Sequence, residues 1–480
     1  MKNVLAFLVT AALAASIVGA EPAPGWTRFR GPNGSGIADD QKPPVELGPG
    51  KNLKWKVSVP GGLSSPIIAG ELLVITAFDQ GKLYTIAYRR ADGAEAWRVE
   101  APVKQLEPYY KPEGSPAAST PATDGTRIVS YFGSCGLFCY DLTGKELWKY
   151  EMPTVSLPGK FGTGVSPIIA DGLAILVRDE MKDPRILAID LSTGSLRWET
   201  KRSSHVSYST PVLWDAPGGR QVVAAGNGHL NGYDLSTGAE KWSLAAMPSG
   251  PCSSPVVADG MLFFAGWSPG GPDDKQFQLP PFDAVLKMAD TNKDGVISRE
   301  EAQKTFLKDM FDPMDANGDG KITRDEWETV RRFMAEGKNL AYALAPGATG
   351  EVPLSSLLWK NTKGLPYLAS ALVYAGQCIV VKDGGLLTAY DEKTGKPAYV
   401  QERVAAAGQY YASPIAAGGN IYVVSHKDGA VTVLKSGSDK PTVVAKNAQL
   451  GERVSATPAV ADNVLYVRTD SHLYAFAEGR

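Results

Sequence analysis

Two stretches of twelve residues carry oxygen-bearing side chains at alternating positions, a spacing that suits a hard cation. One runs from Asp290 to Glu301 and the other from Asp315 to Glu326. Ca²⁺ takes about six to eight oxygen ligands from carboxylates, amides, hydroxyls and backbone carbonyls. The expected ligands of the first site are Asp290, Asn292, Asp294, Val296, Ser298 and Glu301. Those of the second site are Asp315, Asn317, Asp319, Lys321, Thr323 and Glu326.

The other positions of these stretches fit the same chemistry. Val296 and Lys321 would offer backbone carbonyls, so the type of their side chain does not matter. Gly295 and Gly320 allow a sharp bend. Both stretches resemble EF-hand loops along all twelve positions, and the resemblance implies two Ca²⁺ sites. The alternative, an Asp- and Asn-rich turn facing solvent, is disfavoured because two complete matches occur in tandem.

The two loops lie unusually close together in the sequence. Asp315 follows Asp290 by 25 residues, so residues 302–308 are expected to form a shortened connection. This spacing disfavours a calmodulin-like opening motion and favours Ca²⁺ that stabilises the module permanently. The expected apolar core of the module is Phe282, Leu286, Phe306, Phe311, Trp327 and Phe333.

The two loops interrupt a series of sequence repeats, and the structure formed by these repeats must position them. A small polar residue, usually followed by Pro, opens an apolar strand eight times, at Ser65, Thr120, Ser166, Thr210, Ser254, Ser370, Ser413 and Thr457. The successive distances are 55, 46, 44, 44, 116, 43 and 44 residues. One interval exceeds the common period by about 72 residues, so the fifth unit carries the insertion, expected at 275–338.

Each unit reads as four strands. Apolar alternation indicates strands, and an Asp-x-x-Thr-Gly turn with a Trp four residues later indicates a hairpin, as at Asp190–Trp198 and Asp234–Trp242. Four strands in about 44 residues is typical of a β-propeller blade. The repeated Trp is expected to pack between adjacent blades. We therefore predict an all-β, eight-bladed β-propeller with a small α-helical insertion.

These hairpins resemble the pyrroloquinoline quinone (PQQ)-like β-propeller repeats over nearly all of the chain outside the insertion. The segment Trp26–Pro32 is also similar to exported members of that group. The group includes quinoprotein alcohol dehydrogenases and the propeller lipoprotein of the outer-membrane barrel assembly machinery. The resemblance therefore implies the scaffold but not the activity.

The two ends of the chain are expected to share one blade. The last unit supplies about three strands, at 456–461, 464–468 and 472–477, whereas Trp55 lies in an isolated strand near 52–57. Pairing these segments would close the propeller over 21–480 without an open sheet edge. Residues 1–20 are expected to be a signal peptide, because Lys2 precedes an apolar stretch and small residues follow it. We therefore predict export to the periplasm or the medium, with no membrane span in the mature chain.

The net charge and the cysteine content say little about partners or disulfide bonds. The net charge of −2 gives no reason to expect nucleic acid as a partner. Cys135 and Cys139 flank three residues near a predicted hairpin, and the sequence leaves open a disulfide or two small buried residues.

Propellers bind through loops at one end of the central channel. The segments that enter each first strand are rich in Tyr and Lys, which suits a binding funnel, although ordinary inter-blade packing is an equal alternative. They contain Tyr109, Tyr110, Lys111, Lys160, Phe161, His205, Tyr208, Tyr367, Tyr410 and Tyr411.

The favoured hypothesis is an exported, calcium-binding, non-catalytic propeller that binds a protein or small molecule at this funnel. The alternative is a PQQ-dependent quinoprotein oxidoreductase acting on alcohols or sugars. Relatives of that kind carry adjacent cysteines against the quinone, or a Cys-x-x-Cys-His haem site, and this sequence has neither. PQQ therefore has no residue-level support, and catalytic residues are not assigned.

Overall fold

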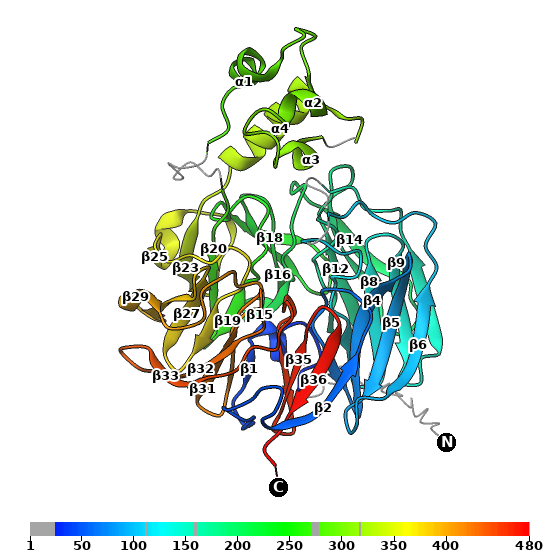
Figure 1. Cartoon of the computed structure of the whole chain (residues 1–480), viewed down its shortest axis with the longest axis vertical. Helices are drawn as coiled ribbons and strands as arrows, with labels where there is room; N and C mark the ends of the chain where they lie inside the picture. Colours follow the sequence, from blue (N-terminus) through cyan, green and yellow to red (C-terminus); the bar gives the residue numbers. More distant parts are fainter. Residues whose placement is uncertain (1–24, 111–112, 158–160, 270–277, 316–317, 480) are drawn as a thin grey trace, which may run out of the picture.

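The computed structural model describes residues 25–479 except 111–112, 158–160, 270–277 and 316–317. The expected signal peptide, residues 1–20, lies outside this part. In the described residues, eight sheets of four or five strands each are arranged as the blades of a propeller, and a ninth, two-stranded sheet lies in the helical module. This module stands at one end of the propeller (Figure 1). The prediction of an eight-bladed propeller with a small helical insertion is confirmed.

The first four blades follow the chain in order. Blade one contains β3 (Ile67–Ala69), β4 (Leu72–Asp79), β5 (Lys82–Arg89) and β6 (Glu95–Ala101). Blade two contains β7 (Ala122–Thr123), β8 (Arg127–Phe132), β9 (Gly136–Asp141) and β10 (Glu146–Glu151). Blade three contains β11 (Ile168–Ala170), β12 (Leu173–Arg178), β13 (Arg185–Asp190) and β14 (Leu196–Lys201). Blade four contains β15 (Val212–Ala216), β16 (Gly219–Ala225), β17 (Leu230–Asp234) and β18 (Glu240–Leu244), with β24 (Gly350–Val352) added at its outer edge.

The other four blades contain the insertion and the closure. Blade five contains β19 (Val256–Ala258), β20 (Met261–Gly266), β23 (Leu340–Leu344) and β25 (Leu357–Asn361). Blade six contains β26 (Leu372–Tyr374), β27 (Gln377–Lys382), β28 (Leu386–Asp391) and β29 (Pro397–Arg403). Blade seven contains β30 (Ile415–Ala417), β31 (Asn420–Val424), β32 (Val431–Lys435) and β33 (Thr442–Lys446), with β1 (Ile37–Ala38) beside β30. Blade eight contains β34 (Ala459–Ala461), β35 (Val464–Arg468), β36 (His472–Phe476) and β2 (Leu53–Ser58).

The eighth blade is built from both ends of the chain. Strand β2 pairs antiparallel with β36, and Trp55 lies opposite Ala475. The strand near 52–57 therefore supplies the outer strand that the last unit lacks, and the ring has no unpaired terminal blade.

A ring of hydrogen bonds joins the starts of the innermost strands. The backbone N–H of Ser65 donates to Thr120 Oγ1 at 2.9 Å, and the same bond repeats from each blade to the next. The other donor–acceptor pairs are Thr120–Ser166, Ser166–Thr210, Thr210–Ser254, Ser254–Ser370, Ser370–Ser413, Ser413–Thr457 and Thr457–Ser65. The Ser or Thr that opens each unit thus satisfies a buried N–H of the preceding blade.

The repeated Trp residues join the outer parts of adjacent blades. The indole N–H of Trp148 donates to the carbonyl of Leu191 at 2.9 Å. Its ring lies on Gly194, where an added Cβ atom would come within 2.7 Å of Trp148 Cγ. Gly194 also has a φ of +74°, so both the close contact and the backbone conformation require glycine. The same contacts recur for the pairs Trp55–Gly93, Trp97–Gly144, Trp198–Gly238 and Trp359–Gly395.

Trp242 packs in an apolar cluster with residues of blade five, as expected, but its hydrogen bond departs from this pattern. Its N–H donates to Gln221 within its own blade at 2.7 Å. Blade five has no Asp-Thr-Gly turn to receive it, because the connection 345–356 replaces that turn. Trp214 joins the two blades instead, donating to the carbonyl of Gly260 at 2.9 Å.

The N-terminal strap, residues 26–37, crosses the innermost strands and contains η1 (Pro32–Gly34). It makes hydrogen bonds with six blades, through Trp26–Ile68, Thr27–Thr123, Arg28–Ile169, Asn33–Leu213, Arg30–Ala371 and Gly36–Ala416. Arg30 is fully buried, and the Arg30 Nη2 to Ala371 O distance is 2.5 Å. The strap ties together strands that belong to distant parts of the sequence.

The hydroxyl ring generates a stability prediction. Thr120→Val keeps the side-chain shape but removes the acceptor for the buried N–H of Ser65, and should lower the free energy of unfolding by about 1–3 kcal/mol. Chemical denaturation of the purified chain measures this change. Thr120→Ser, which keeps the hydroxyl, and Thr442→Val on the exposed face of β33 should each lose much less. Equal losses in all three variants would contradict a specific role for the ring.

Candidate functional site

The first acidic loop is folded around the carboxylate of Asp290. This carboxylate accepts hydrogen bonds from the backbone N–H groups of Lys293, Asp294 and Gly295, at 2.7, 3.3 and 3.0 Å. Gly295 has φ +82°, a left-handed conformation that glycine adopts without steric cost. The loop thus wraps around its first expected ligand.

The next two expected ligands repeat this arrangement two residues apart. Asn292 Oδ1 accepts from the N–H of Asp294 at 2.9 Å, and Asp294 Oδ1 accepts from the N–H of Val296 at 3.1 Å. Each of these exposed side chains therefore bonds to the turn of its own loop.

Glu301 connects the end of the loop to its beginning. Its Oε2 accepts from the N–H of Ser298 at 2.9 Å, while its Oε1 accepts from the N–H and the hydroxyl of Thr291 at 2.8 and 2.9 Å. The backbone N–H of Ser298 is the largest cause that lowers the pKa of Glu301 to about 2. The side chain is therefore a carboxylate over the physiological pH range, which is the form that binds Ca²⁺.

The second loop repeats this geometry in its described residues. Asp315 accepts from the N–H groups of Gly318, Asp319 and Gly320 at 2.8, 3.1 and 3.1 Å. Glu326 Oε2 accepts from the N–H and the hydroxyl of Thr323 at 2.8 and 2.7 Å. Asn317, an expected ligand, lies outside the described residues.

The two loops are held together by a short β contact. In β21 (Ile297–Ser298) and β22 (Lys321–Ile322), the fully buried Ile297 and Ile322 are partners. The surrounding helices are α1 (Phe282–Ala289), α2 (Arg299–Ala302), α3 (Phe311–Met314) and α4 (Arg324–Ala335). Ser298 and Thr323 cap α2 and α4 with reciprocal bonds to Glu301 and Glu326, so the expected ligands also begin the exit helices.

The module's core differs from the expected one at two positions. Phe282, Phe311 and Trp327 are buried in it, and Leu286 packs against it. Phe306 is wrongly assigned, because it is 46% exposed in the shortened connection between the loops. Phe333 is also wrongly assigned, because its ring packs against Gly250 of the propeller. A Cβ atom added to Gly250 would lie 3.3 Å from Phe333 Cζ.

The donor set fits a hard divalent cation. It consists of carboxylate, amide, hydroxyl and backbone carbonyl oxygens at alternate positions of two pre-bent loops. Within the described residues, no group of three His, Cys, Asp or Glu side chains is close enough together to hold a metal ion. The carboxylates of Asp290 and Asp315 instead accept hydrogen bonds from N–H groups of their own loops. The assignment of the twelve ligands stays a prediction.

Aromatic side chains predicted at the funnel pair with neighbours from other loops. Tyr411 stacks on His426 with ring centroids 3.8 Å apart, and its hydroxyl donates to Glu113 at 2.6 Å, which links blade seven to the segment entering blade two. Tyr109 pairs with Phe161 through an isolated β-bridge. The structure thus brings together segments that enter blades two and three, and segments that enter blades two and seven.

The other predicted funnel residues divide into three groups. Tyr110, Phe161 and Tyr367 are 46, 40 and 41% exposed, and His205 is also exposed. Tyr208 packs edge-to-face on Phe161, whereas Tyr410 is buried and donates to the carbonyl of Ala406. Lys111 and Lys160 lie outside the described residues. Tyr110, Phe161, Tyr367 and His205 thus keep exposed surface, whereas Tyr410 serves packing, and the binding funnel stays a prediction.

A buried carboxyl group near these loops was not singled out from the sequence. Glu107 is 1% exposed, and its carboxyl accepts from the N–H and the hydroxyl of Thr163 at 3.2 and 2.5 Å. Burial raises the pKa of Glu107 to about 7. A lone Glu in a loop gives no sequence signal for burial, because the residues that cover it come from the next blade.

The cysteines are free thiols. Cys139 lies in β9 and Cys135 precedes that strand; both are buried, and burial raises the pKa of each to about 12. Of the two alternatives left open by the sequence, the structure has the small buried residues.

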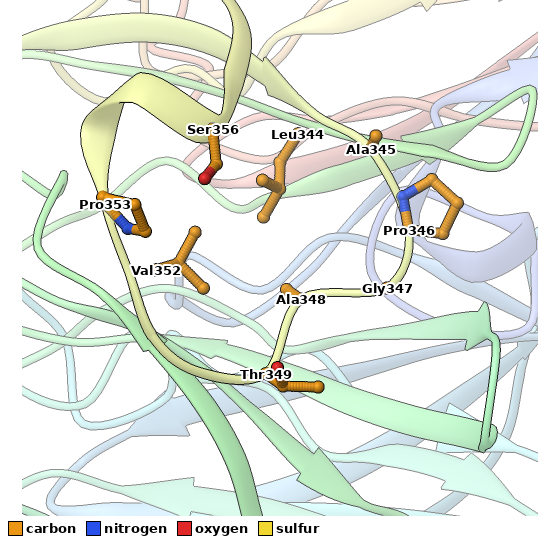
Figure 2. A pocket seen from close by; sticks show the side chains of 9 residues that line it. All are labelled: Leu344, Ala345, Pro346, Gly347, Ala348, Thr349, Val352, Pro353 and Ser356. Atoms are coloured by element: carbon orange, nitrogen blue, oxygen red, sulfur yellow. The ribbon is translucent and has the colours of Figure 1, made fainter.

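Figure 2 shows a pocket of about 300 Å³ within the connection between β23 and β25. Its lining consists of Leu344, Ala345, Pro346, Gly347, Ala348, Thr349, Val352, Pro353 and Ser356. These residues carry no ionisable side chain, so the pocket offers no side-chain acid or base. Among the described residues, no helix is both long and apolar enough to cross a bilayer.

Comparison with known families identifies both parts of the chain. The family model described as outer membrane protein assembly factor BamB matches residues 85–270 and 339–479. The EF hand model matches residues 282–306 and 307–330. No curated protein sequence gives a significant match.

Solved structures share the fold at low sequence identity. BamB from Moraxella catarrhalis is 14% identical, with a TM-score of 0.53, over 88% of this chain and 98% of that one. A europium-containing methanol dehydrogenase is 12% identical, with a TM-score of 0.56, over 95% and 98%. Quinohemoprotein alcohol dehydrogenase from Comamonas testosteroni is 12% identical, with a TM-score of 0.53, over 96% and 82%. At these identities the similarity shows the fold alone.

Glu107 generates a pH prediction. Its pKa is higher in the folded than in the unfolded chain, so folding binds a proton and the free energy of unfolding should fall as the pH rises from about 4.5 to about 7. The loss is up to about 3 kcal/mol, since one pKa unit corresponds to about 1.4 kcal/mol. Glu107→Gln should remove this component, whereas Glu146→Gln on exposed β10 should not. Denaturation at pH 5 and pH 8 measures it; identical pH dependences of Glu107→Gln and wild type would contradict the assignment.

Proposed function

This chain belongs to the propeller family described as outer membrane protein assembly factor BamB, and we propose that it is an exported, calcium-binding member that binds a partner without transforming it. Two binding regions carry the proposal. One is the EF-hand module with two Ca²⁺ sites, and the other is the aromatic funnel at the end of the channel.

The duplicated loop geometry is the observation that supports calcium binding. In both loops the first Asp accepts N–H bonds from the residues three, four and five positions later. In both loops the last Glu accepts the N–H of the residue three positions earlier. Since these bonds already set the loop path, Ca²⁺ has only to redirect carboxylate, amide and hydroxyl oxygens that lie inside it.

Ca²⁺ would act as a stabilising ligand of the module. Three of the expected ligands in the described part of the second loop are carboxylates, those of Asp315, Asp319 and Glu326, and bringing them close together without a cation is costly. Ca²⁺ would neutralise them and hold Glu326 at the start of α4. A ligand that binds only the folded module raises its stability in proportion to the logarithm of its concentration.

Exposed aromatic faces support partner binding at the funnel. Tyr110, Phe161 and Tyr367 each expose more than a third of their surface although most apolar side chains of the propeller are buried. Exposed aromatic residues with a polar tip are typical of interfaces. The hydroxyl of Tyr411, held by Glu113, adds a fixed hydrogen-bonding group.

Export is part of the proposal on the basis of residues 1–20. Their positive start, apolar stretch and small terminal residues have the pattern of a signal peptide. Millimolar calcium outside the cytoplasm would keep two sites of modest affinity occupied.

Isothermal calorimetry tests the calcium sites. We expect about two Ca²⁺ per chain, and Glu301→Gln with Glu326→Gln should abolish binding because each change removes a bidentate carboxylate. The matched control is Glu300→Gln with Asp325→Asn, which removes the same charge from exposed neighbours and should retain both sites. Binding by the first double variant would contradict the ligand assignment.

Reconstitution with PQQ and Ca²⁺ tests the alternative function. A non-catalytic propeller should show no stoichiometric quinone chromophore and no dye-linked oxidation of alcohols or sugars. A chromophore at one PQQ per chain together with such oxidation would overturn the non-catalytic proposal and leave the calcium sites unaffected.

A further inference from the structure

We propose that Ca²⁺ in the helical module sets the position of the channel-mouth segment, residues 247–252, through the docked C-terminal end of α4. This inference rests on the proposed calcium binding and adds a structural connection between the two binding regions. Figure 1 shows α4 extending from the module toward the propeller. The contacts at its C-terminal end are made with the connection from blade four to blade five and with the β16–β17 loop of blade four.

Ser249 receives the end of α4. Its hydroxyl lies 2.9 Å from the carbonyl oxygen of Phe333 and 3.1 Å from that of Met334, and the residue is 4% exposed. The last carbonyls of a helix have no partner within the helix. Ser249 supplies a donor from another element, so the helix end is bound to the channel-mouth segment at a defined place.

Backbone contacts make this docking close. The N–H of Lys338 donates to the carbonyl of Met247 at 2.7 Å, and the N–H of Met247 donates to the carbonyl of Gly228 at 3.2 Å. A Cβ on Gly337 would lie 2.4 Å from Ser249 Oγ. The chain leaving α4 thus lies directly on the segment, which in turn lies on the hairpin loop of blade four.

Asn227 provides a second connection. Its amide nitrogen donates to Glu336 Oε2 at 3.1 Å, and its amide oxygen accepts from the N–H of Gly250 at 3.3 Å. One side chain therefore joins the residue after α4 to the middle of the channel-mouth segment. The ring of Phe333 covers Gly250 from the same side, which explains why this Phe is absent from the core of the module.

The channel-mouth segment leads directly to the centre of the propeller. The N–H of Tyr208, one of the predicted funnel residues, donates to the carbonyl of Pro251 at 2.9 Å. Ser254, two residues beyond the segment, accepts from the N–H of Thr210 in the hydroxyl ring at 3.0 Å. A displacement of the channel-mouth segment would therefore move Tyr208 relative to the hydroxyl ring, which stays in place.

The other end of α4 is where Ca²⁺ would act. Thr323 caps the helix and Glu326 lies in its first turn, and both are expected ligands of the second site. The helix has 12 residues and is about 18 Å long, a rigid element between the two regions. Ca²⁺ would change the contacts of Glu326 and so the position of the first turn, and the docked last turn would follow it.

Hydrogen exchange of the full mature chain, with and without Ca²⁺, tests the coupling. We expect the amides of Met247, Ser249, Gly250 and Cys252 to exchange at least tenfold more slowly with Ca²⁺. Ser249→Ala should still bind two Ca²⁺ by calorimetry but lose this difference, because the donor to the end of α4 is gone. Ser236→Ala, in an exposed turn of the same blade, is the matched control and should behave as wild type.

The outcomes separate this inference from the proposed function. Absence of calcium binding to the wild type would overturn the proposed calcium function and, with it, the coupling. Binding of two Ca²⁺ with unchanged exchange at residues 247–252 would overturn the coupling alone. Retained calcium dependence in Ser249→Ala would overturn the route through Ser249. Asn227→Asp, which places a carboxylate against Glu336, should weaken the calcium dependence even if Ser249→Ala does not fold.

Discussion

The propeller depends on the need of each innermost strand for a hydrogen-bond acceptor where it begins. Apart from β30, which also pairs with β1, these strands have a neighbour in their own sheet on one side only. The N–H that precedes each of them would otherwise be buried without a partner. A hydroxyl from the next blade satisfies it, and the pattern repeats until Thr457 donates to Ser65. Because every blade supplies the acceptor of its neighbour, the ring is complete only when the two ends of the chain lie side by side.

Ring closure also explains where the chain tolerates a large insertion. The module enters between β20 and β23 of blade five, so the innermost strand β19 keeps its place in the ring. Blade five departs from the repeat in its third connection as well, where 345–356 replaces the usual turn and adds β24 to the outer edge of blade four. Trp214 then makes the indole hydrogen bond between blades four and five that Trp242 does not make. The irregular blade is stabilised by its neighbour.

Local patterns were sufficient to predict the scaffold and the acidic loops. The Ser/Thr-Pro openings predicted the number of blades, and the alternating oxygens predicted which residues wrap each loop. Residues whose role depends on a distant partner could not be found in this way. Phe306 and Phe333 both match a helical core pattern, yet one is exposed by the shortened connection and the other covers Gly250. Glu107 is buried by Thr163 and other residues of a neighbouring unit.

The sequence by itself determined the repeat, its period, the interrupted unit and the types of oxygen ligand, because strand alternation, turns and loop ligands depend on residues close together in the chain. Only the tertiary structure decided which surfaces meet: the strap across the innermost strands, the hydroxyl ring, and the docking of α4 on blade four. These contacts join residues far apart in sequence, such as Ser249 and Phe333, and no local pattern encodes their distance. The EF-hand loops can be recognised from the chain alone, whereas the contact of α4 with residues 247–252 exists only in the folded protein.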